Sequence, residues 1–346
     1  MGSRDQFTEL IAAKGVEVKT ILGGKIRRYF SFMNFLDAPK IVLGIFQAIW
    51  KMFWSMPDVV FSKGGTGSLP VVLVAAFYRI PIVIHDSDAK FGLNNSFAAG
   101  FAKRIGVSFK EALALVPERK AFLAGNPVRQ ELTQKRMPQD AAKKELGFDP
   151  AKPLLFVVCG SRGATRINEF ILSCLKEFLG VVQILHQTGM ENYDETVNIA
   201  STILKGASPA YRATAFLTEH MASALSAADV VMGRAGSGMI FEVAAFGKPA
   251  MLIPLPESAR DHQRENAYAF ERAGGGVVIE EKNLLPHIVL AKLHKLLENR
   301  SEYETMSKAA SSFFIPDAAE RIAEEIVNAA KGEKMQVSPD RDKMAL

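Results

Sequence analysis

The chain has 346 residues, 48% of them hydrophobic and 23% charged, and its 42 Lys and Arg against 37 Asp and Glu give a net charge of +5. This ordinary globular composition excludes a collagen, a coiled coil and a wholly disordered chain. The length suggests two domains, and the two cysteines exclude a disulfide scaffold and favour a reducing compartment. The positive excess suits an anionic substrate or an acidic membrane surface, but it is too small and dispersed to indicate nucleic acid by itself.

The residues that follow Met1 match neither a signal peptide nor the opening strand of an α/β domain. Further on, residues 41–56 are apolar except for Gly44 and a polar row, spaced by four, at Gln47, Lys51 and Ser55. This segment is too short for a transmembrane span. It is either a core helix or an interfacial helix that dips Phe and Trp side chains into a bilayer. The preceding residues 25–32, where basic and aromatic residues are interleaved, support the interfacial interpretation.

From Pro57 onward, short apolar runs alternate with stretches of helical periodicity. The apolar runs are rich in Val, Ile and Leu without alternating polarity, which is typical of parallel strands covered on both faces. The predicted strands are 59–61, 82–84, 154–158, 182–185, 230–232, 250–253 and 277–279. The predicted helices lie near 67–78, 165–178, 219–227, 238–246, 262–273 and 283–299. This βαβ repetition predicts a doubly wound α/β protein whose ligands bind beyond the carboxyl ends of its strands.

Two segments organise the rest of the chain. The polar stretch 130–153 separates two sets of strands and is interpreted as an interdomain connection with a short helix. The last helix, 316–331, begins after Pro316 with Asp317 in its first turn. The charged tail 332–346 is expected to be frayed.

Four loops after predicted strands could bind an anion, since glycines let the backbone approach a ligand and helix amino termini offer N–H groups. They are residues 62–68, 160–164, 233–238 and 254–263. None matches the full dinucleotide fingerprint or a Walker A motif, and each alone is compatible with a tight turn. The three loops in the second half would converge on one sheet edge, which indicates a nucleotide site. There a diphosphate would meet helix amino termini and Arg234, and Glu242 could accept from a ribose hydroxyl.

The remaining polar residues give weaker evidence of a functional site. Asp86-Ser87-Asp88 has the D-x-D form of some metal–nucleotide sites, but a catalytic metal needs more oxygen ligands, so acceptor contact or loop capping is favoured. Of the six histidines, only His85 and His262 lie at strand-to-helix junctions of candidate loops. Cys159 is predicted to be a buried, inert thiol.

Several segments in the same order resemble the MurG family of glycosyltransferases. They are Gly125-Asn-Pro-Val-Arg129, Cys159-Gly-Ser-Arg-Gly-Ala164 with Asn168, His186-Gln-Thr-Gly189, Arg234-Ala-Gly-Ser with Glu242 and Ala244-Ala-Phe-Gly-Lys-Pro249, and Pro254-Leu-Pro256 with Asp261-His-Gln263 and Asn266-Ala267. The resemblance runs from about Met1 to Ile326. It implies an inverting transfer of N-acetylglucosamine from UDP-N-acetylglucosamine to undecaprenyl-diphosphate-linked muramyl-pentapeptide, in peptidoglycan synthesis, without a metal or other cofactor.

The resemblance also implies an architecture and a location. Two Rossmann-like, doubly wound α/β domains of the GT-B type are expected: residues 1–128 for the lipid acceptor and the membrane, and residues 129–315 for the UDP-sugar. The helix 316–331 would return to the first domain, followed by a flexible tail, 332–346. The enzyme would be peripheral at the cytoplasmic face of the bacterial cell membrane, with no nucleic-acid partner.

Site residues are carried over by their positions in the matching motifs. The donor positions are Arg129, Ser161, Leu217, Arg234, Gly236, Ser237, Gly238, Met239, Glu242 and Gln263. The acceptor-side positions are Gly64, Gly65, Ser68 and Asp88, with His85 as the candidate catalytic residue.

Three departures from the family pattern matter. Asp88 stands where the family usually has asparagine, and its carboxylate would repel a diphosphate unless it is protonated or paired. Met239 stands where a threonine commonly meets the phosphate. The chain also begins just after the family's second strand, so we expect the opening strand–loop–helix–strand unit, with the histidine proposed as base, to be missing. Two alternatives stay open: another UDP-sugar enzyme on this fold, such as a glycolipid transferase or an epimerase, and an inactive donor-binding scaffold.

Overall fold

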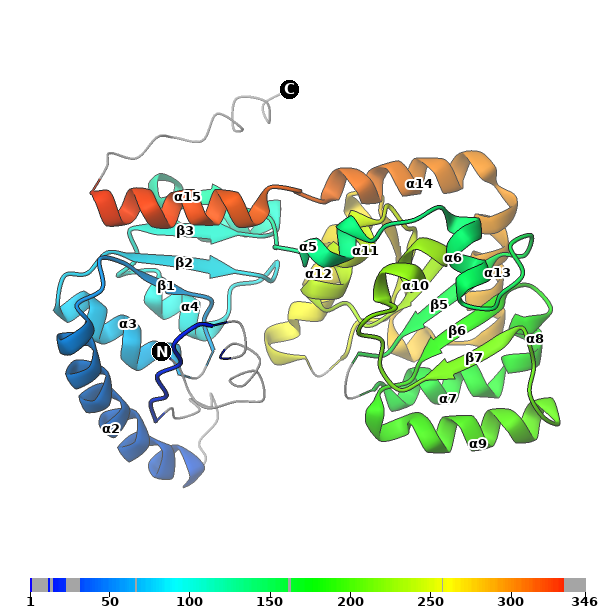
Figure 1. Ribbon diagram of the computed structural model, residues 1–346, viewed down its shortest axis with the longest axis horizontal. Coiled ribbons are helices and arrows are strands. Elements are labelled where there is room, and N and C mark those ends of the chain that lie inside the picture. Colours follow the sequence, from blue (N-terminus) through cyan, green and yellow to red (C-terminus); the bar gives the residue numbers. More distant parts are fainter. Residues whose placement is uncertain are drawn as a thin grey trace. The chain divides into compact units, whose positions relative to one another are not determined.

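The structure is a computed structural model that describes residues 1, 12, 15–22, 32–65, 67–160, 163–256 and 258–332, with backbone alone for 32–38 and 259 (Figure 1). The chain divides into two compact units. Unit 1 consists of Met1–Gly125 and Asp317–Leu346, and unit 2 of Asn126–Pro316. The division therefore falls after Gly125 rather than after residue 128.

Unit 1 contains a parallel sheet whose described strands are ordered β1-β2-β3-β4. Its elements are α2 (Phe32–Ser55), β1 (Val60–Ser62), α3 (Ser68–Phe77), β2 (Ile82–Asp86), α4 (Leu93–Ala98), β3 (Arg104–Val107), the 3-10 turns η1 (Lys110–Leu115) and η2 (Glu118–Lys120), β4 (Ala121–Leu123) and α15 (Ala318–Lys331). The β2 strand is buried along its whole length, which explains its unbroken apolar run from Ile82 to Ile84.

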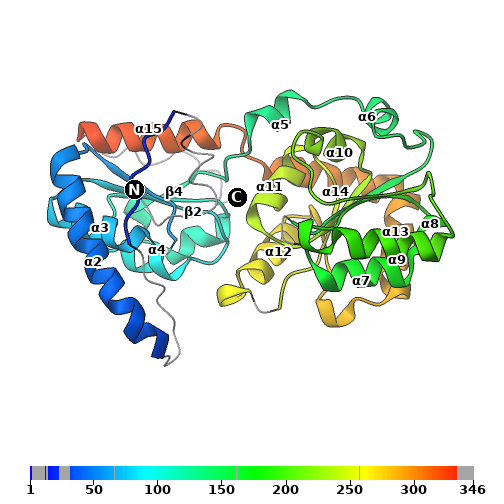
Figure 2. The same cartoon turned by 60° about the horizontal axis from the view of Figure 1, so that its bottom comes forward.

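The carboxyl-terminal helix α15 packs on strands β2 and β3 of unit 1, as both ribbon views show (Figures 1 and 2). The guanidinium of Arg104, on β3, donates from Nε to Glu325 Oε2 at 2.7 Å. Ile322 of the same helix is buried against Phe122 and Ala124. A charged contact and an apolar contact thus join α15 to a sheet formed about 200 residues earlier in the chain.

Unit 2 contains a parallel sheet with described strands in the order β10-β9-β8-β5-β6-β7. Its elements are α5 (Gln130–Gln134), α6 (Gln139–Glu145), β5 (Leu154–Val158), α7 (Thr165–Ser173), α8 (Leu175–Leu179), β6 (Gln183–Gln187), η3 (Met190–Asn192), α9 (Tyr193–Leu204), β7 (Tyr211–Thr214), α10 (Met221–Ala227), β8 (Val230–Gly233), α11 (Ser237–Ala245), β9 (Ala250–Leu252), η4 (Ala259–Asp261), α12 (His262–Arg272), β10 (Gly276–Val278), η5 (Glu281–Asn283), α13 (Pro286–Glu298) and α14 (Arg300–Phe313). Alternate residues of β5 enter two different core clusters, so this sheet is covered on both faces.

Sequence periodicity located most strands but missed three. The predicted strands are present with ends shifted by at most two residues, whereas β3, β4 and β7 were not predicted. Polar or small residues, such as Arg104 and Gly106 in β3, interrupt the apolar run that the prediction relied on. The predicted helix 165–178 is two helices, α7 and α8, with a break at Cys174.

The interpretation of 130–153 as a connection with one short helix was wrong. The segment forms two helices, α5 and α6, and α6 packs against α10 inside unit 2. Gln139 on α6 donates to the carbonyls of Ala227 and Ala228, at 3.2 and 3.0 Å. Gln139 thus binds this segment to the end of α10 and the residues that lead into β8, while many other residues between 130 and 153 are exposed.

Helix α2 has three distinct faces. Ala48 and Met52 are buried in the core of unit 1. The polar row that was noted in the sequence binds the segment 20–22: Gln47 Oε1 accepts from Leu22 N at 2.8 Å, and Lys51 Nζ donates to Thr20 O. A third face is exposed and aromatic. Among the described residues, no helix combines the length and apolarity needed to cross a membrane.

Candidate active site

The turn after β8 leads into α11 and leaves the amino terminus of that helix open. Gly233 ends the strand, and a Cβ there would lie 2.3 Å from the carbonyl oxygen of Val158, so the close approach of β8 to β5 requires glycine. In contrast, a Cβ at Gly236 or Gly238 would meet nothing within 4 Å. Within the described chain no side chain caps this helix, so its first N–H groups face the open space. This arrangement suits an anion.

Glu242 and Arg129 come together in unit 2. Glu242 follows the open turn on α11, and its Oε1 lies 3.4 Å from Nη2 of Arg129, which precedes α5. Desolvation raises the pKa of Glu242, and the guanidinium of Arg129 partly opposes this shift. The pair places a carboxylate that can accept from hydroxyls, together with a cation that can contact phosphate, near the same helix.

Arg234 makes more contacts within the protein than its motif suggested. Its Nη1 lies 2.6 Å from Glu281 Oε2 and donates to the carbonyls of Ile253 and Pro254. The side chain is 16% exposed. In this conformation the guanidinium ties the β8 turn to the end of β9, so it shapes the site and shares its charge with Glu281.

The other residues expected to contact the UDP-sugar differ in what they contact in the structure. Gln263, at the start of α12, accepts from Leu255 N at 3.1 Å. The N–H of buried Leu217 already donates to Gln187 Oε1 at 3.0 Å, which leaves only its carbonyl for a base. Met239 packs its side chain against the core of unit 2 instead of the open turn. Ser161 lies outside the described residues.

The acceptor-side loop after β1 turns on two glycines. Gly64 and Gly65 have φ values of +82° and +93°, which favour glycine. Ser68 Oγ donates to Gly65 O at 2.8 Å, and a Cβ at Gly64 would lie 2.8 Å from Asn95 Oδ1. Asn95, on α4, was not predicted from the sequence, because no motif marks it and its role depends on a neighbour far away in the chain.

The expectation of a catalytic His85 does not fit the structure. Its side chain is fully buried, and its Nε2 lies 2.8 Å from Gly125 O and 3.2 Å from Ser108 Oγ. Burial, aided by the nearby Lys63, lowers its pKa to about 4. Because the ring is inaccessible in this conformation and its lowered pKa makes it a weak base, the structure does not support His85 as the catalytic base.

Asp86 caps the loop after β2 rather than binding a metal. It accepts from the backbone N–H groups of Asp88 and Gly92 and from Asn95 Nδ2, at 3.1, 2.9 and 3.0 Å. The described residues contain no group of three or more His, Cys, Asp and Glu that could hold a metal ion.

Cys159 is buried beside Asn168, and burial raises the pKa of its thiol to about 12. A thiol with this pKa stays protonated at neutral pH and is a poor nucleophile. His186 is equally buried and lies 3.0 Å from Asn168 Oδ1, so this group of residues belongs to the core of unit 2.

Comparison with known proteins settles the family. Residues 1–107 match the Glycosyltransferase family 28 N-terminal domain, and residues 154–322 match the Glycosyltransferase family 28 C-terminal domain. The chain is 36% identical over 315 residues to the UDP-N-acetylglucosamine--N-acetylmuramyl-(pentapeptide) pyrophosphoryl-undecaprenol N-acetylglucosamine transferase of Clostridium kluyveri, covering 91% of this chain and 86% of the relative. The chain belongs to the MurG family.

Solved structures agree with the MurG assignment. The crystal structure of Acinetobacter baumannii MurG superposes with a TM-score of 0.71 at 26% identity, covering 93% of this chain and 88% of that one. The prediction of a two-domain α/β GT-B fold is thereby confirmed. A UDP-GlcNAc 2-epimerase from Neisseria meningitidis has a TM-score of 0.61 at 13% identity over 92% of this chain and 88% of that one, which shows a shared fold alone.

Proposed function

We propose that the protein transfers N-acetylglucosamine from UDP-N-acetylglucosamine to undecaprenyl-diphosphate-linked muramyl-pentapeptide. The observation that carries the proposal is the open amino terminus of α11, flanked by the Arg129–Glu242 pair, in a chain of the MurG family. In a single displacement, an acceptor hydroxyl attacks the anomeric carbon and the bond to UDP breaks with inversion. The hydroxyl proton goes to a base, and UDP leaves with the bonding electron pair.

Unit 2 provides groups suited to the leaving UDP. The N–H groups at the start of α11 can stabilise negative charge that develops on the diphosphate. The Glu242 carboxylate can accept hydrogen bonds from the ribose hydroxyls, and the Arg129 guanidinium can contact a phosphate or keep Glu242 ionised. The loops that follow β1 and β2 belong to unit 1, and we assign them to the acceptor.

Calorimetry with UDP-N-acetylglucosamine tests the donor assignment. We expect saturable binding by the full chain, and competition by UDP, because most of the contacts assigned above are made to the nucleotide diphosphate. Absence of detectable binding at millimolar donor would contradict the donor site itself. Analysis of the sugar nucleotide after incubation separates transfer from 2-epimerisation.

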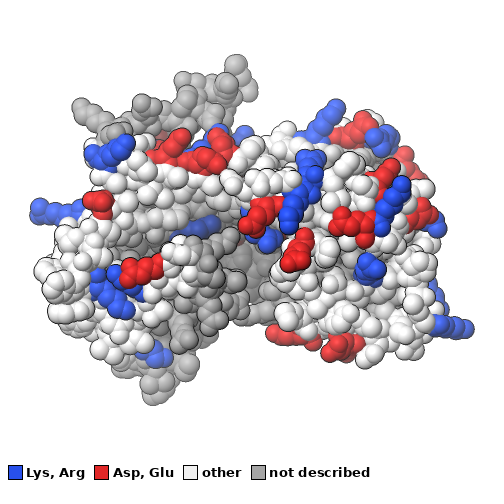
Figure 3. Space-filling model, in the orientation of Figure 1, with Lys and Arg blue, Asp and Glu red and all other residues white. Residues whose placement is uncertain are grey.

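The exposed face of α2 supports docking on the membrane surface. Its large apolar side chains recur about every four residues: Val42, Leu43, Phe46, Trp50, Phe53 and Trp54 are between 51% and 69% exposed. Trp and Phe side chains on one helix face can insert at the lipid headgroup boundary. On the molecular face drawn in Figure 3, basic and acidic side chains are interspersed, and the attraction proposed for α2 is insertion of its exposed apolar face.

Replacing Phe53 and Trp54 together with serine should reduce co-sedimentation with phosphatidylglycerol-containing vesicles by about tenfold or more, since two large apolar side chains would no longer be inserted. Phe216→Ser in unit 2, at a position 41% exposed, is the matched control and should sediment like the unmodified protein. Unchanged sedimentation of the folded double variant would contradict membrane docking through α2.

A further inference from the structure

The acceptor-side loops of unit 1 contain two carboxylates where the substrate assigned to them carries a diphosphate. Asp86 ends β2, and Asp88 follows two residues later, with its N–H bonded to Asp86 Oδ1. Two negative charges here would repel a diphosphate, and water and ions screen charges within a partly buried loop only in part. Lys90 in the same loop offsets one of these charges, and a second counter-charge is therefore expected nearby.

Strand register supplies a candidate for this counter-charge. Strands β1 and β2 are parallel neighbours, and Ser62 at the end of β1 pairs with Ile84. The next residue on β1, Lys63, thus emerges beside His85, at about 5 Å between strands, and one residue before Asp86. Its backbone leads directly into Gly64 and Gly65, and a Cβ at Gly65 would meet nothing within 4 Å. Lys63 therefore lies beside the strand end that leads into the acidic loop.

Electrostatic coupling supports this placement. Although Lys63 as a whole is exposed, neighbouring atoms desolvate its ammonium, and this lowers its pKa. The carboxylates of Asp86 and Asp88 act in the opposite direction and favour the charged form. The lysine thus interacts with both acids of the β2 loop.

Asn95 is a second, independent feature that points to a ligand at this loop. The side chain is 4% exposed, and its Nδ2 donates to Asp86 Oδ2. Its Oδ1 is buried without a hydrogen-bond donor among the described residues and faces Gly64. A buried acceptor without a donor is costly, and a ligand hydroxyl would satisfy it.

We propose that Lys63 is an acceptor-binding residue whose ammonium offsets the charge of Asp86 and Asp88 and contacts the diphosphate of the lipid-linked substrate. The inference rests on the proposed function for the identity of that substrate. The loop from Asp86 to Lys90 contains two carboxylates and one ammonium, so Lys63 brings the formal net charge of the loop from −1 to zero. The N–H groups at the start of α3 add further positive potential on the same side of the loop.

A double-variant cycle tests this role without requiring turnover. The probe is farnesyl diphosphate, titrated by calorimetry into the full chain. We expect K63Q to weaken its binding by about tenfold, the range for one charge-assisted contact. Adding D88N to K63Q should restore at least a third of the lost affinity, because it removes the charge that the lysine offset. K110Q, at an exposed lysine of η1, is the control and should bind as the unmodified protein does.

Steady-state kinetics provide a second readout. K63Q should raise the KM for the lipid-linked acceptor while leaving the KM for UDP-N-acetylglucosamine unchanged. Three results would each overturn the role of Lys63. They are unaltered probe binding in K63Q, no recovery of binding when D88N is added, and an equal rise in both KM values. If the chain and its variants show the predicted differences in farnesyl diphosphate binding but the unmodified chain transfers no sugar, the proposed function fails while the diphosphate site stands. Sugar transfer that K63Q leaves unaffected would instead support the proposed function and remove Lys63 from the acceptor site.

Discussion

Glu242→Gln should weaken the binding of UDP-N-acetylglucosamine by roughly 10- to 100-fold, the loss expected when hydrogen bonds to a charged acceptor become bonds to a neutral one. The carboxylate is 23% exposed and adjoins the open turn of α11, so its bonds to the ribose would form in a partly desolvated place. Stability should change little, because the ion pair lost among the described residues is the 3.4 Å contact with Arg129, which is 51% exposed. Calorimetry measures the change.

Glu195→Gln on α9 is a suitable control, because it removes one exposed carboxylate from the same unit. The control should bind the donor as the unmodified chain does. Equal affinity of E242Q and the unmodified chain would remove Glu242 from the donor site.

The same carboxylate gives donor binding a pH dependence. Burial raises the pKa of Glu242, so it takes up a proton at a higher pH than an exposed glutamate does. Donor affinity should therefore be complete above this pKa and fall as the pH drops through it. E242Q should lack this part of the pH profile.

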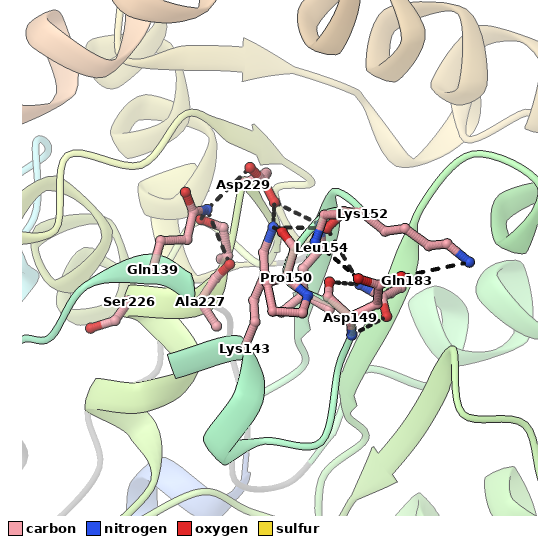
Figure 4. Close-up of polar contacts among 12 residues, drawn as sticks. Gln139, Lys143, Asp149, Pro150, Lys152, Leu154, Gln183, Ser226, Ala227 and Asp229 are labelled. Atoms are coloured by element: carbon pink, nitrogen blue, oxygen red, sulfur yellow. Dashed lines mark hydrogen bonds and ion pairs between the residues drawn. The ribbon is translucent and has the colours of Figure 1, made fainter. Parts of the chain in front are cut away.

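Asp229→Ala should destabilise unit 2 by about 3–5 kcal/mol, because it leaves a buried ammonium without its partner. Asp229 Oδ2 lies 2.8 Å from Lys143 Nζ and accepts from Leu154 N at 2.7 Å, while Oδ1 accepts from Gln139 Nε2 at 3.1 Å (Figure 4). Lys143 is only 4% exposed. The network holds α6 to the amino-terminal ends of β5 and β8, and urea unfolding would register its loss.

Two further variants identify the cause. The Arg166–Glu169 pair is exposed at both ends and 3.9 Å apart, so Glu169→Ala should cost less than about 1 kcal/mol. Combining Asp229→Asn with Lys143→Met should recover most of the stability, because both charges of the Lys143–Asp229 pair are then removed. If D229A and E169A proved equally mild, the buried network would not hold α6 in place.

The sequence was sufficient where one local pattern determined the structure. The apolar run 154–158 coincides with β5, because a central parallel strand is buried on both faces. Loops that join a strand to a helix, such as 233–238, were found because glycines mark them. The edge strand β7 was missed, since its half-buried residues and the exposed Arg212 do not form an apolar run.

The features that could not be predicted from the sequence depend on contacts between residues far apart in the chain. His85 is at a strand end, as expected of a site residue, yet the carbonyl of Gly125 and the hydroxyl of Ser108 enclose it. Lys63 and Asn95 gain their significance from strand register and from a contact with Gly64, neither of which any motif encodes. In α2, Gln47 and Lys51 of the polar row bind the segment 20–22, and the aromatic face is the exposed one.

The central claim is tested most directly by incubating the full chain with UDP-N-acetylglucosamine, radiolabelled in the sugar, and lipid-linked muramyl-pentapeptide in detergent or vesicles. The proposed function predicts that label moves to the lipid fraction as a disaccharide-pentapeptide, with one UDP released per sugar transferred. Donor that binds but leaves the lipid unlabelled, or that is converted to its 2-epimer, would contradict it.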